Sequence, residues 1–213
     1  MKLRFILITL LFPLFLFGQL DTIYLDNPSF EGEPRKGIQG FNTIDGWKDH
    51  GLSQFPMESG PDIHPNGLWE VTREPLDGKT YLGMVTRDTE SWETIYQSLD
   101  KPLYKGSVYT LELYLAQSSK YMSGTLRSKN EIVNFNTPIT LRILGSSKKL
   151  QDAEILWTSF AIDHSEWKKY SIDLIPTEDI NRLILQAYYE IPTLAPYNGH
   201  LLLDHISPII QIK

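Results

Sequence analysis

Residues 108–116 read VYTLELYLA, and this stretch carries the clearest evidence of the fold class. Its apolar residues take every second position, and its more polar residues take the positions between. The first set is Tyr109, Leu111, Leu113 and Leu115, and the second is Thr110, Glu112 and Tyr114. Successive side chains of a β-strand point to opposite faces, so this period of two predicts a strand with one face in a core.

The same alternation recurs further along the chain, at residues 138–144, 168–174 and 181–189. Shorter runs with strand character lie at residues 20–25, 68–72, 80–85, 93–99, 155–162 and 200–206. Together these predict about ten strands and no amphipathic helix. A parallel sheet needs crossover connections, usually helical, between its strands. The sequence therefore predicts an all-β fold, a two-sheet antiparallel sandwich.

The N-terminal segment indicates the compartment. Lys2 and Arg4 precede an apolar run over residues 5–17, and Gly18 follows it. This pattern predicts a cleaved signal peptide over residues 1–18, since the run is short for a hydrocarbon layer about 30 Å thick. The alternative is an uncleaved membrane anchor. Residues 19–213 then form a single β-sandwich module that is secreted, whether extracellular, periplasmic or at the cell surface, and that does not span the membrane.

Charge and cysteine content exclude several classes of partner and of chemistry. Without the two basic residues of the leader, 18 basic residues face 26 acidic ones, a net charge of −8. Nucleic acids and anionic membranes both require clustered cations, so neither is an expected partner. The chain has no cysteine, which excludes disulfides and thiolate chemistry. Stability must then come from a sizeable core.

Two segments lack strand patterns, residues 32–66 and residues 118–136. Both are expected to be long loops, and long loops in a compact domain are usually functional or mobile.

Several short sequence motifs follow one another along the chain in a characteristic order. They comprise Asn27–Glu31 (NPSFE), Gly46-Trp47, Gly78–Gly83 (GKTYLG), Trp92, Gln97, Gly106–Leu111, Glu166–Tyr170 (EWKKY) and Leu203–Ser207 (LDHIS). Across residues 24–207 this set resembles carbohydrate-binding modules of the family 4, 9 and 22 type. The resemblance implies a galactose-binding-like jelly roll. It also implies a non-catalytic role.

The resemblance further implies a structural calcium ion between the first and last strands. The matching positions are Glu31 and Asp204, with Asp26 or Asp77 as extra oxygen donors. Calcium takes six to eight oxygen ligands, which two carboxylates and loop carbonyls could supply. His205 stands where an acidic residue is more usual. The alternative is that both carboxylates are ordinary surface or turn residues.

A ligand surface is expected on the strand faces turned away from the core. Such positions mix aromatic with hydrogen-bonding side chains, as a sugar requires. They are Trp92, Thr94, Tyr96, Glu112, Tyr114, Arg142, Gln186 and Tyr188. Aromatic residues also favour strands without any ligand. A site at one end of the sandwich is the alternative, built from the loop aromatics Trp47, Trp69, Tyr121 and Tyr197.

Catalytic motifs are weak. There is no nucleophile elbow and no phosphate-binding glycine motif, and the Asp-His pairs are sequence neighbours that point apart along a strand. The sequence therefore predicts a secreted, non-catalytic module whose partner is a glycan or polysaccharide. The alternative is a cell-surface or matrix module that binds a protein. A glycoside hydrolase is a third alternative, because its paired carboxylates can come from distant strands.

Overall fold

The computed structural model describes residues 21–38, 44–52, 58–65, 67–125, 131–190 and 195–212. The predicted signal peptide lies outside these ranges. Within them the secondary structure is almost entirely β, and no helix is long and apolar enough to cross a bilayer. The elements are β1 (Thr22–Ile23), β2 (Lys48–Asp49), β3 (Asp62–His64), η1 (Leu68–Glu70), β4 (Tyr81–Arg87), β5 (Ser91–Trp92), β6 (Thr94–Leu103), β7 (Tyr109–Ala116), β8 (Met122–Gly124), β9 (Ile132–Asn134), β10 (Thr140–Ser146), η2 (Leu150–Asp152), β11 (Glu154–Thr158), β12 (Lys168–Leu174), β13 (Ile180–Tyr188), β14 (Gly199–Asp204) and β15 (Ile209–Gln211).

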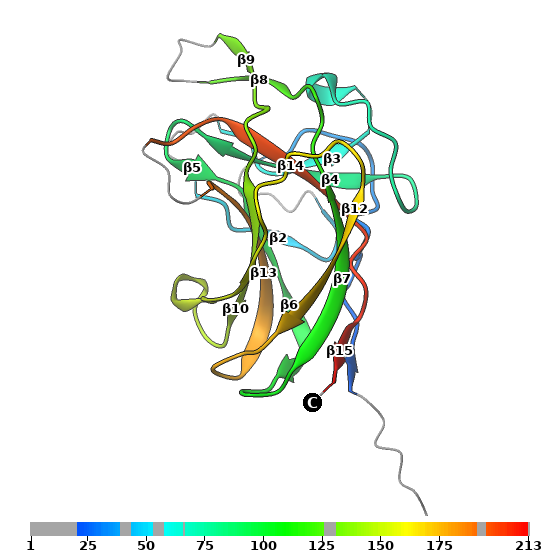
Figure 1. The fold of residues 1–213 in the computed structure, drawn as a ribbon, viewed down its shortest axis with the longest axis vertical. Coiled ribbons are helices and arrows are strands. Elements are labelled where there is room, and N and C mark those ends of the chain that lie inside the picture. The colour runs from blue at the N-terminus through cyan, green and yellow to red at the C-terminus, as the bar shows by residue number, and fades with distance from the viewer. Residues whose placement is uncertain are drawn as a thin grey trace, which may run out of the picture.

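Two antiparallel sheets form the sandwich (Figure 1). The eight-stranded sheet has the order β1-β15-β7-β14-β4-β3, with β12 paired to β7 and β5 paired to β4. The five-stranded sheet has the order β11-β10-β13-β6-β2, and β8 and β9 form a separate hairpin. The predicted all-β jelly-roll sandwich is confirmed as the fold.

The main core lies between the two sheets and follows the period of two. On β7, Leu111, Leu113 and Leu115 are buried and pack in the same cluster as Ile143 of β10 and Leu185 of β13. Each fully buried leucine or isoleucine contributes about 1.5–3 kcal/mol relative to an exposed one. The alternation seen in the sequence is therefore the pattern that holds the sheets together.

Strand predictions with clear alternation are confirmed. The 168–174 strand matches β12, and β7, β10 and β13 lie within two residues of their predicted bounds. The strand predicted over residues 68–72 is wrong, because this stretch forms the single turn η1. Trp69 and Glu70 there have φ of 56° and 62°, a left-handed backbone that cannot join a strand ladder. The 32–66 loop also contains two short strands, β2 and β3.

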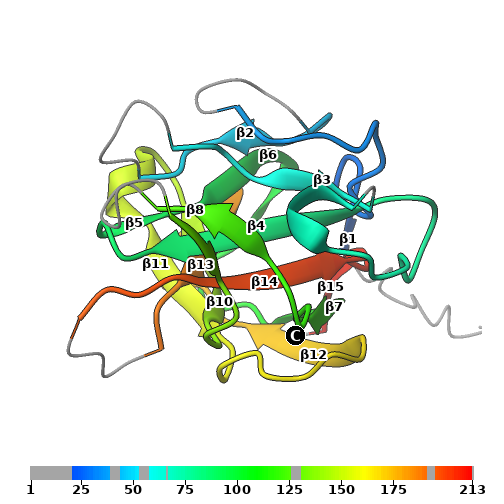
Figure 2. The same ribbon diagram turned by 90° about the horizontal axis from the view of Figure 1, so that it is seen from above.

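A second apolar cluster covers the other face of the larger sheet. Tyr81 and Val85 of β4 and Leu202 of β14 pack there with Tyr121 and Phe135, which flank the β8–β9 hairpin. Seen from above, β8 lies over β4 (Figure 2). All seven residues of β4 and all six of β14 are buried, because each strand has a core on both faces.

Polar side chains are buried within this second cluster. Asp62 accepts hydrogen bonds from the Tyr121 hydroxyl and from Trp69 Nε1 at 2.8 Å. His200 Nε2 accepts from the Ser118 amide at 2.8 Å. The other histidine, His64, stacks on Tyr81 at 5.6 Å, and both its ring nitrogens are buried without a hydrogen-bond partner. Burial lowers the pKa of His64 to about 3 and the pKa of His200 to about 4, so both are neutral at physiological pH.

His64 should make the fold sensitive to acid. In the unfolded chain its imidazole binds a proton near pH 6.5, whereas in the folded protein its pKa is about 3. Between these values the unfolded state binds more protons, so the free energy of unfolding falls as the pH falls from 6.5 towards 3. Urea unfolding at pH 7 and pH 5 measures this effect. Between these two pH values, the free energy of unfolding of the unmodified protein should fall by about 2 kcal/mol more than that of His64→Leu.

A substitution of the exposed His50, His50→Leu, is the control, and it should leave the acid sensitivity of the unmodified protein in place. Equal losses in the unmodified protein and in His64→Leu would contradict this role of His64.

Candidate functional site

The outer face of the five-stranded sheet carries most of the predicted ligand residues. Strand register aligns their side chains in rows across the strands, because residues opposite each other in a ladder share a face. One row runs through Thr158, Arg142, Gln186 and Thr94 of β11, β10, β13 and β6. The next runs through Ile155, Leu144, Ile184, Tyr96 and Lys48. The register thus builds a mixed aromatic, amide and aliphatic surface.

Aromatic contacts lie at one end of this face, around Tyr188, the last residue of β13. The ring of Trp92 meets the ring of Tyr188 edge-on at 4.9 Å. The guanidinium of Arg142 lies on the Tyr188 ring with its carbon 3.4 Å from the centroid. Stacking of this kind restricts the guanidinium to one plane, and its donors then have fixed directions. Trp92, Arg142 and Tyr188 form one preorganised unit.

Two hollows lie on this side of the sheet. The first has a volume of about 440 Å³ and is lined by His50, Gly51, Leu52, Trp92, Thr94, Leu144, Leu150, Gln151, Ala153, Ile184 and Gln186. The second has a volume of about 350 Å³ and is lined by Thr140, Arg142, Ile155, Thr158, Ser159, Phe160, Ala161, Tyr189 and Glu190. Arg142 and Gln186 are neighbours in the ladder, so the two hollows adjoin. We call the whole surface the sheet groove.

Phe160 is the most exposed large apolar side chain of the described chain. Its side chain is 90% exposed, and Ile155 beside it in the same hollow is 54% exposed. A phenylalanine side chain that stays exposed to water contributes no hydrophobic burial to the stability of the fold. Phe160 thus stands exposed at the rim of the second hollow. No sequence pattern singles this residue out, because it follows the end of β11 and breaks no alternation.

The eight predicted ligand residues do not all share one face. The structure brings six of them together on or beside the five-stranded sheet, namely Trp92, Thr94, Tyr96, Arg142, Gln186 and Tyr188. Glu112 and Tyr114 lie on β7 of the eight-stranded sheet, so their expected place on a common face is corrected.

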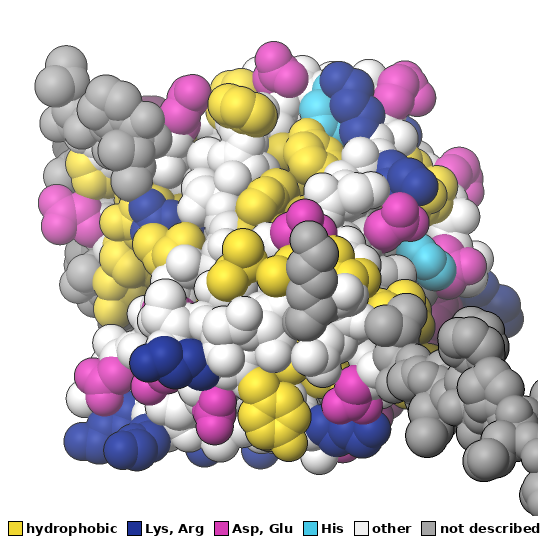
Figure 3. All heavy atoms as spheres, turned by 60° about the horizontal axis from the view of Figure 1, so that its bottom comes forward, with side chains coloured by type: hydrophobic (Ala, Val, Ile, Leu, Met, Phe, Trp, Pro, Cys, Tyr) yellow, Lys and Arg dark blue, Asp and Glu magenta, His cyan; other side chains and the backbone are white. Residues whose placement is uncertain are grey.

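Glu112 and Tyr114 have partners of their own on that other sheet. Glu112 pairs with Lys169 at 3.0 Å, and Tyr114 meets the His205 ring at 6.0 Å. Space-filling shows Lys and Arg interspersed with Asp and Glu on one face of the molecule, without a broad basic patch (Figure 3). Glu112 and Tyr114 are both half-buried, and each has a partner close to its own sheet.

The loop aromatics do not assemble into one end site. Trp47 and Tyr121 are buried, each 2% exposed, in the main and the second core respectively. Tyr197 packs on the main core and donates its hydroxyl to the Pro138 carbonyl at 3.0 Å. Of the four, Trp69 lines a cavity.

The two predicted calcium ligands lie on either side of one loop. Asp204 Oδ2, at the end of β14, accepts from the amides of Leu76 and Asp77 at 2.8 and 3.1 Å. Glu31 accepts from the amide of Lys79 at 3.0 Å and from that of Thr80 at 3.3 Å. The backbone amides of the loop 76–80 therefore bind both carboxylates, Glu31 from the start of the sandwich and Asp204 from its last part.

One oxygen of this pair is left without a partner. Asp204 Oδ1 is buried and accepts no hydrogen bond, and burial raises the pKa of Asp204 to about 6. A buried carboxylate oxygen without a donor is costly unless a cation meets it. The described residues hold no cluster of three or more His, Asp or Glu side chains around an ion.

Solved structures share this fold at low sequence identity. A cyclase from Fischerella sp. TAU is 12% identical, and the match covers 91% of this chain and 98% of the cyclase with a TM-score of 0.52. An α-L-arabinofuranosidase is 11% identical, and the match covers 92% of this chain but 27% of that enzyme with a TM-score of 0.51. The CBM22-1 xylan-binding domain from Paenibacillus barcinonensis is 16% identical over 91% of this chain and 96% of the domain, with a TM-score of 0.48.

No protein-family model matches the sequence, and no curated protein matches it. Identities of this size concern the fold alone, and one fold carries both binding modules and enzymes. The function must be argued from the site.

Proposed function

We propose that the protein is a secreted, non-catalytic glycan-binding module that holds an extended carbohydrate in the sheet groove. The observation that carries this proposal is the pair of adjoining hollows, one lined by Trp92 and the other by Arg142 and Phe160, with Tyr188 in contact with both Trp92 and Arg142. Secretion rests on the leader predicted over residues 1–18.

The chemistry of the groove suits sugar rings. Aromatic side chains at the rim and centre can cover the C–H faces of a pyranose, as Phe160 and Trp92 are placed to do. Arg142, Gln186 and Thr94 offer donors and acceptors for hydroxyl groups along one ladder row. These groups are positioned by strand register, so little conformational entropy is lost when the ligand binds.

The width of the groove favours a chain over a single sugar. Neighbouring strands lie about 4.8 Å apart, so the five strands of this sheet span about 19 Å. The two hollows lie side by side across these strands. A ligand that fills both must be an oligosaccharide segment, and a polysaccharide is the simplest source.

The acidic residues of the groove support a binding role. Glycoside hydrolysis uses two carboxyl groups on either side of the scissile bond. Among the residues that the structure describes, the first hollow is lined by no Asp or Glu, and the second by Glu190. A single carboxylate does not supply both an acid and a base or nucleophile.

Removing the exposed aromatic should weaken binding without unfolding the protein. Phe160→Ala and Trp92→Ala are expected to reduce affinity for the bound polysaccharide by roughly tenfold, the loss of about 1.4 kcal/mol of stacking and burial. Affinity electrophoresis in gels containing neutral polysaccharides, followed by calorimetry with matching oligosaccharides, measures this change.

Tyr114→Ala is the matched control, because this tyrosine lies on the other sheet. It should bind like the unmodified protein. If no polysaccharide is retained, or if Tyr114→Ala weakens binding as much as Phe160→Ala, the groove is not the glycan site.

We further propose that a calcium ion joins Glu31 and Asp204 and stabilises the loop 76–80. The support is the buried, unpartnered Asp204 Oδ1 next to that loop. The ion would neutralise two carboxylates that otherwise lie close to backbone amides alone. Its role is structural, since neither residue lines the sheet groove.

Calcium should raise the melting temperature. A ligand at 100 times its Kd stabilises the native state by about 2.7 kcal/mol, which corresponds to about 5–10 °C for a domain of this size. Asp204→Asn should abolish the shift, because the amide oxygen still accepts from the loop amides while the charge is lost. Asp173→Asn, at an exposed position on β12, should keep it. Identical melting curves of the unmodified protein in calcium and in EDTA would exclude the ion.

A further inference from the structure

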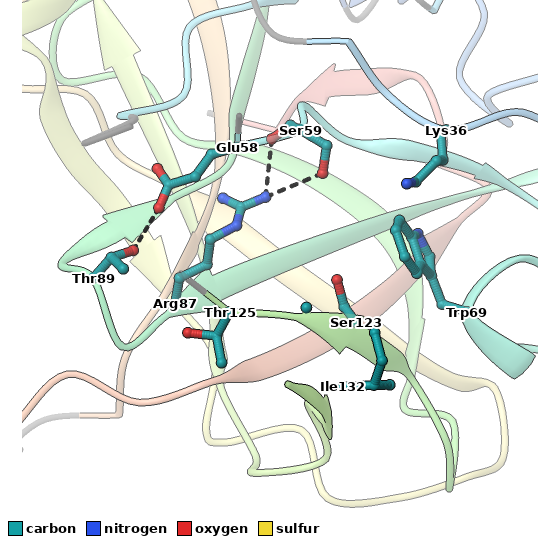
Figure 4. Close-up of a pocket in the computed structure, with 10 residues that line it drawn as sticks. Lys36, Glu58, Ser59, Trp69, Arg87, Thr89, Ser123, Thr125 and Ile132 are labelled. Atoms are coloured by element: carbon teal, nitrogen blue, oxygen red, sulfur yellow. Dashed lines mark hydrogen bonds between the residues drawn. The ribbon is translucent and has the colours of Figure 1, made fainter. Parts of the chain in front are cut away.

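A third cavity shares no lining residue with the two hollows of the sheet groove, although a small hollow of about 10 Å³ shares Ser59 and Arg87 with this cavity and Leu52 and Trp92 with the groove. The volume of the third cavity is about 310 Å³ (Figure 4). The lining residues are Lys36, Glu58, Ser59, Trp69, Arg87, Thr89, Ser123, Gly124, Thr125 and Ile132. They come from the segment before β3, from η1, from the β4–β5 turn and from the β8–β9 hairpin. Figure 1 shows this hairpin at one end of the sandwich. We call it the end cavity.

One wall of the end cavity presents a cation without a carboxylate partner. Lys36 Nζ lies 4.0 Å from the centroid of the Trp69 ring. Lys36 is exposed and forms no ion pair with any described residue. An aromatic face attracts an ammonium group but does not neutralise its charge. The charge of Lys36 therefore remains available to an anion.

The second cation of the cavity is already balanced. Arg87 Nη2 pairs with Glu93 at 2.5 Å and donates to the Ser59 carbonyl at 2.9 Å. Glu58 accepts from the Thr89 hydroxyl at 2.5 Å. Figure 4 shows Arg87 between Glu58 and Thr89 on one side and Lys36 and Trp69 on the other. An anion beside Lys36 is thus separated from the lining carboxylate of Glu58 by a guanidinium.

Contacts within the protein already fix the side of the cavity formed by Lys36 and Trp69. Trp69 donates its indole N–H to buried Asp62 at 2.8 Å and stacks on Tyr121 at 6.2 Å. Its backbone has the left-handed φ of 56°, which costs energy for a residue with a side chain. Strain held in place by buried contacts is common at ligand sites. Asp62 and Tyr121 therefore position the ring that carries Lys36.

The remaining lining groups fit a sugar. Ser59, Thr89, Ser123 and Thr125 line the end cavity with hydroxyl oxygens, of which those of Thr89 and Thr125 already donate to Glu58 and Asp88, and Ile132, 61% exposed, adds an apolar edge. We propose that the end cavity binds an acidic sugar residue, with its carboxylate at Lys36. This site goes beyond the proposed function, because the sheet groove has no excess positive charge to bind an acidic sugar. Among the described residues, its first hollow is lined by no Asp, Glu, Lys or Arg, and its second by Arg142 and Glu190.

The test uses trisaccharides of galacturonate, glucuronate and mannuronate, titrated by calorimetry at low and high salt. At least one should bind, more weakly as salt rises, because the site is open to solvent. Its methyl ester, which lacks the charge, should bind roughly tenfold more weakly, as when a hydrogen bond to a charged group is lost. Lys36→Ala should show a similar loss, and Lys36→Arg should restore most of the affinity.

Two variants distinguish the end cavity from binding elsewhere on the molecule. Lys105→Ala removes an exposed lysine in the turn after β6, at the other end of the sandwich, and should change nothing (Figure 1). Trp92→Ala damages the sheet groove and should leave uronate binding intact. The proposal is overturned if no uronate binds, if the ester binds equally well, or if Lys36→Ala behaves like Lys105→Ala. It is also overturned if Trp92→Ala abolishes binding, since the acidic sugar then occupies the sheet groove.

Discussion

The burial of both faces of β4 and β14 is the constraint on which the second core and the end cavity depend. A strand in a simple sandwich buries one face, but these two bury a second face under η1 and the residues around the β8–β9 hairpin. Covering that face encloses Asp62, His64 and His200, and buried polar atoms must find partners or lose charge. Asp62 meets Trp69 and Tyr121, and both histidines stay neutral.

The two proposed carbohydrate sites therefore have different origins. The sheet groove follows from strand register, since Thr94, Gln186 and Arg142 are neighbours in adjoining ladders. The end cavity follows from the second core, because buried Asp62 orients Trp69 and Trp69 carries Lys36. A change in the second core would alter the end cavity while leaving the ladder rows in place.

The period of two is sufficient to predict the long strands and which of their residues are buried. It places Leu111, Leu113 and Leu115 in the core and leaves Tyr114 and Glu112 outside. It cannot assign a strand to a sheet, because alternation describes two faces of one strand and not its neighbours. Alternation alone therefore groups Glu112 and Tyr114 with Arg142, whereas the fold puts them on the other sheet.

Local alternation and side-chain type were enough to predict the fold class and most strand bounds. Six of the eight residues expected in a ligand surface lie on or beside one sheet, and their role in binding stays a prediction. Three features required the folded chain: Phe160 stands exposed at the groove, Asp204 Oδ1 is buried without a partner, and Lys36 lies on Trp69. These features depend on contacts between segments far apart in the chain. The alternation in VYTLELYLA carries no information about them.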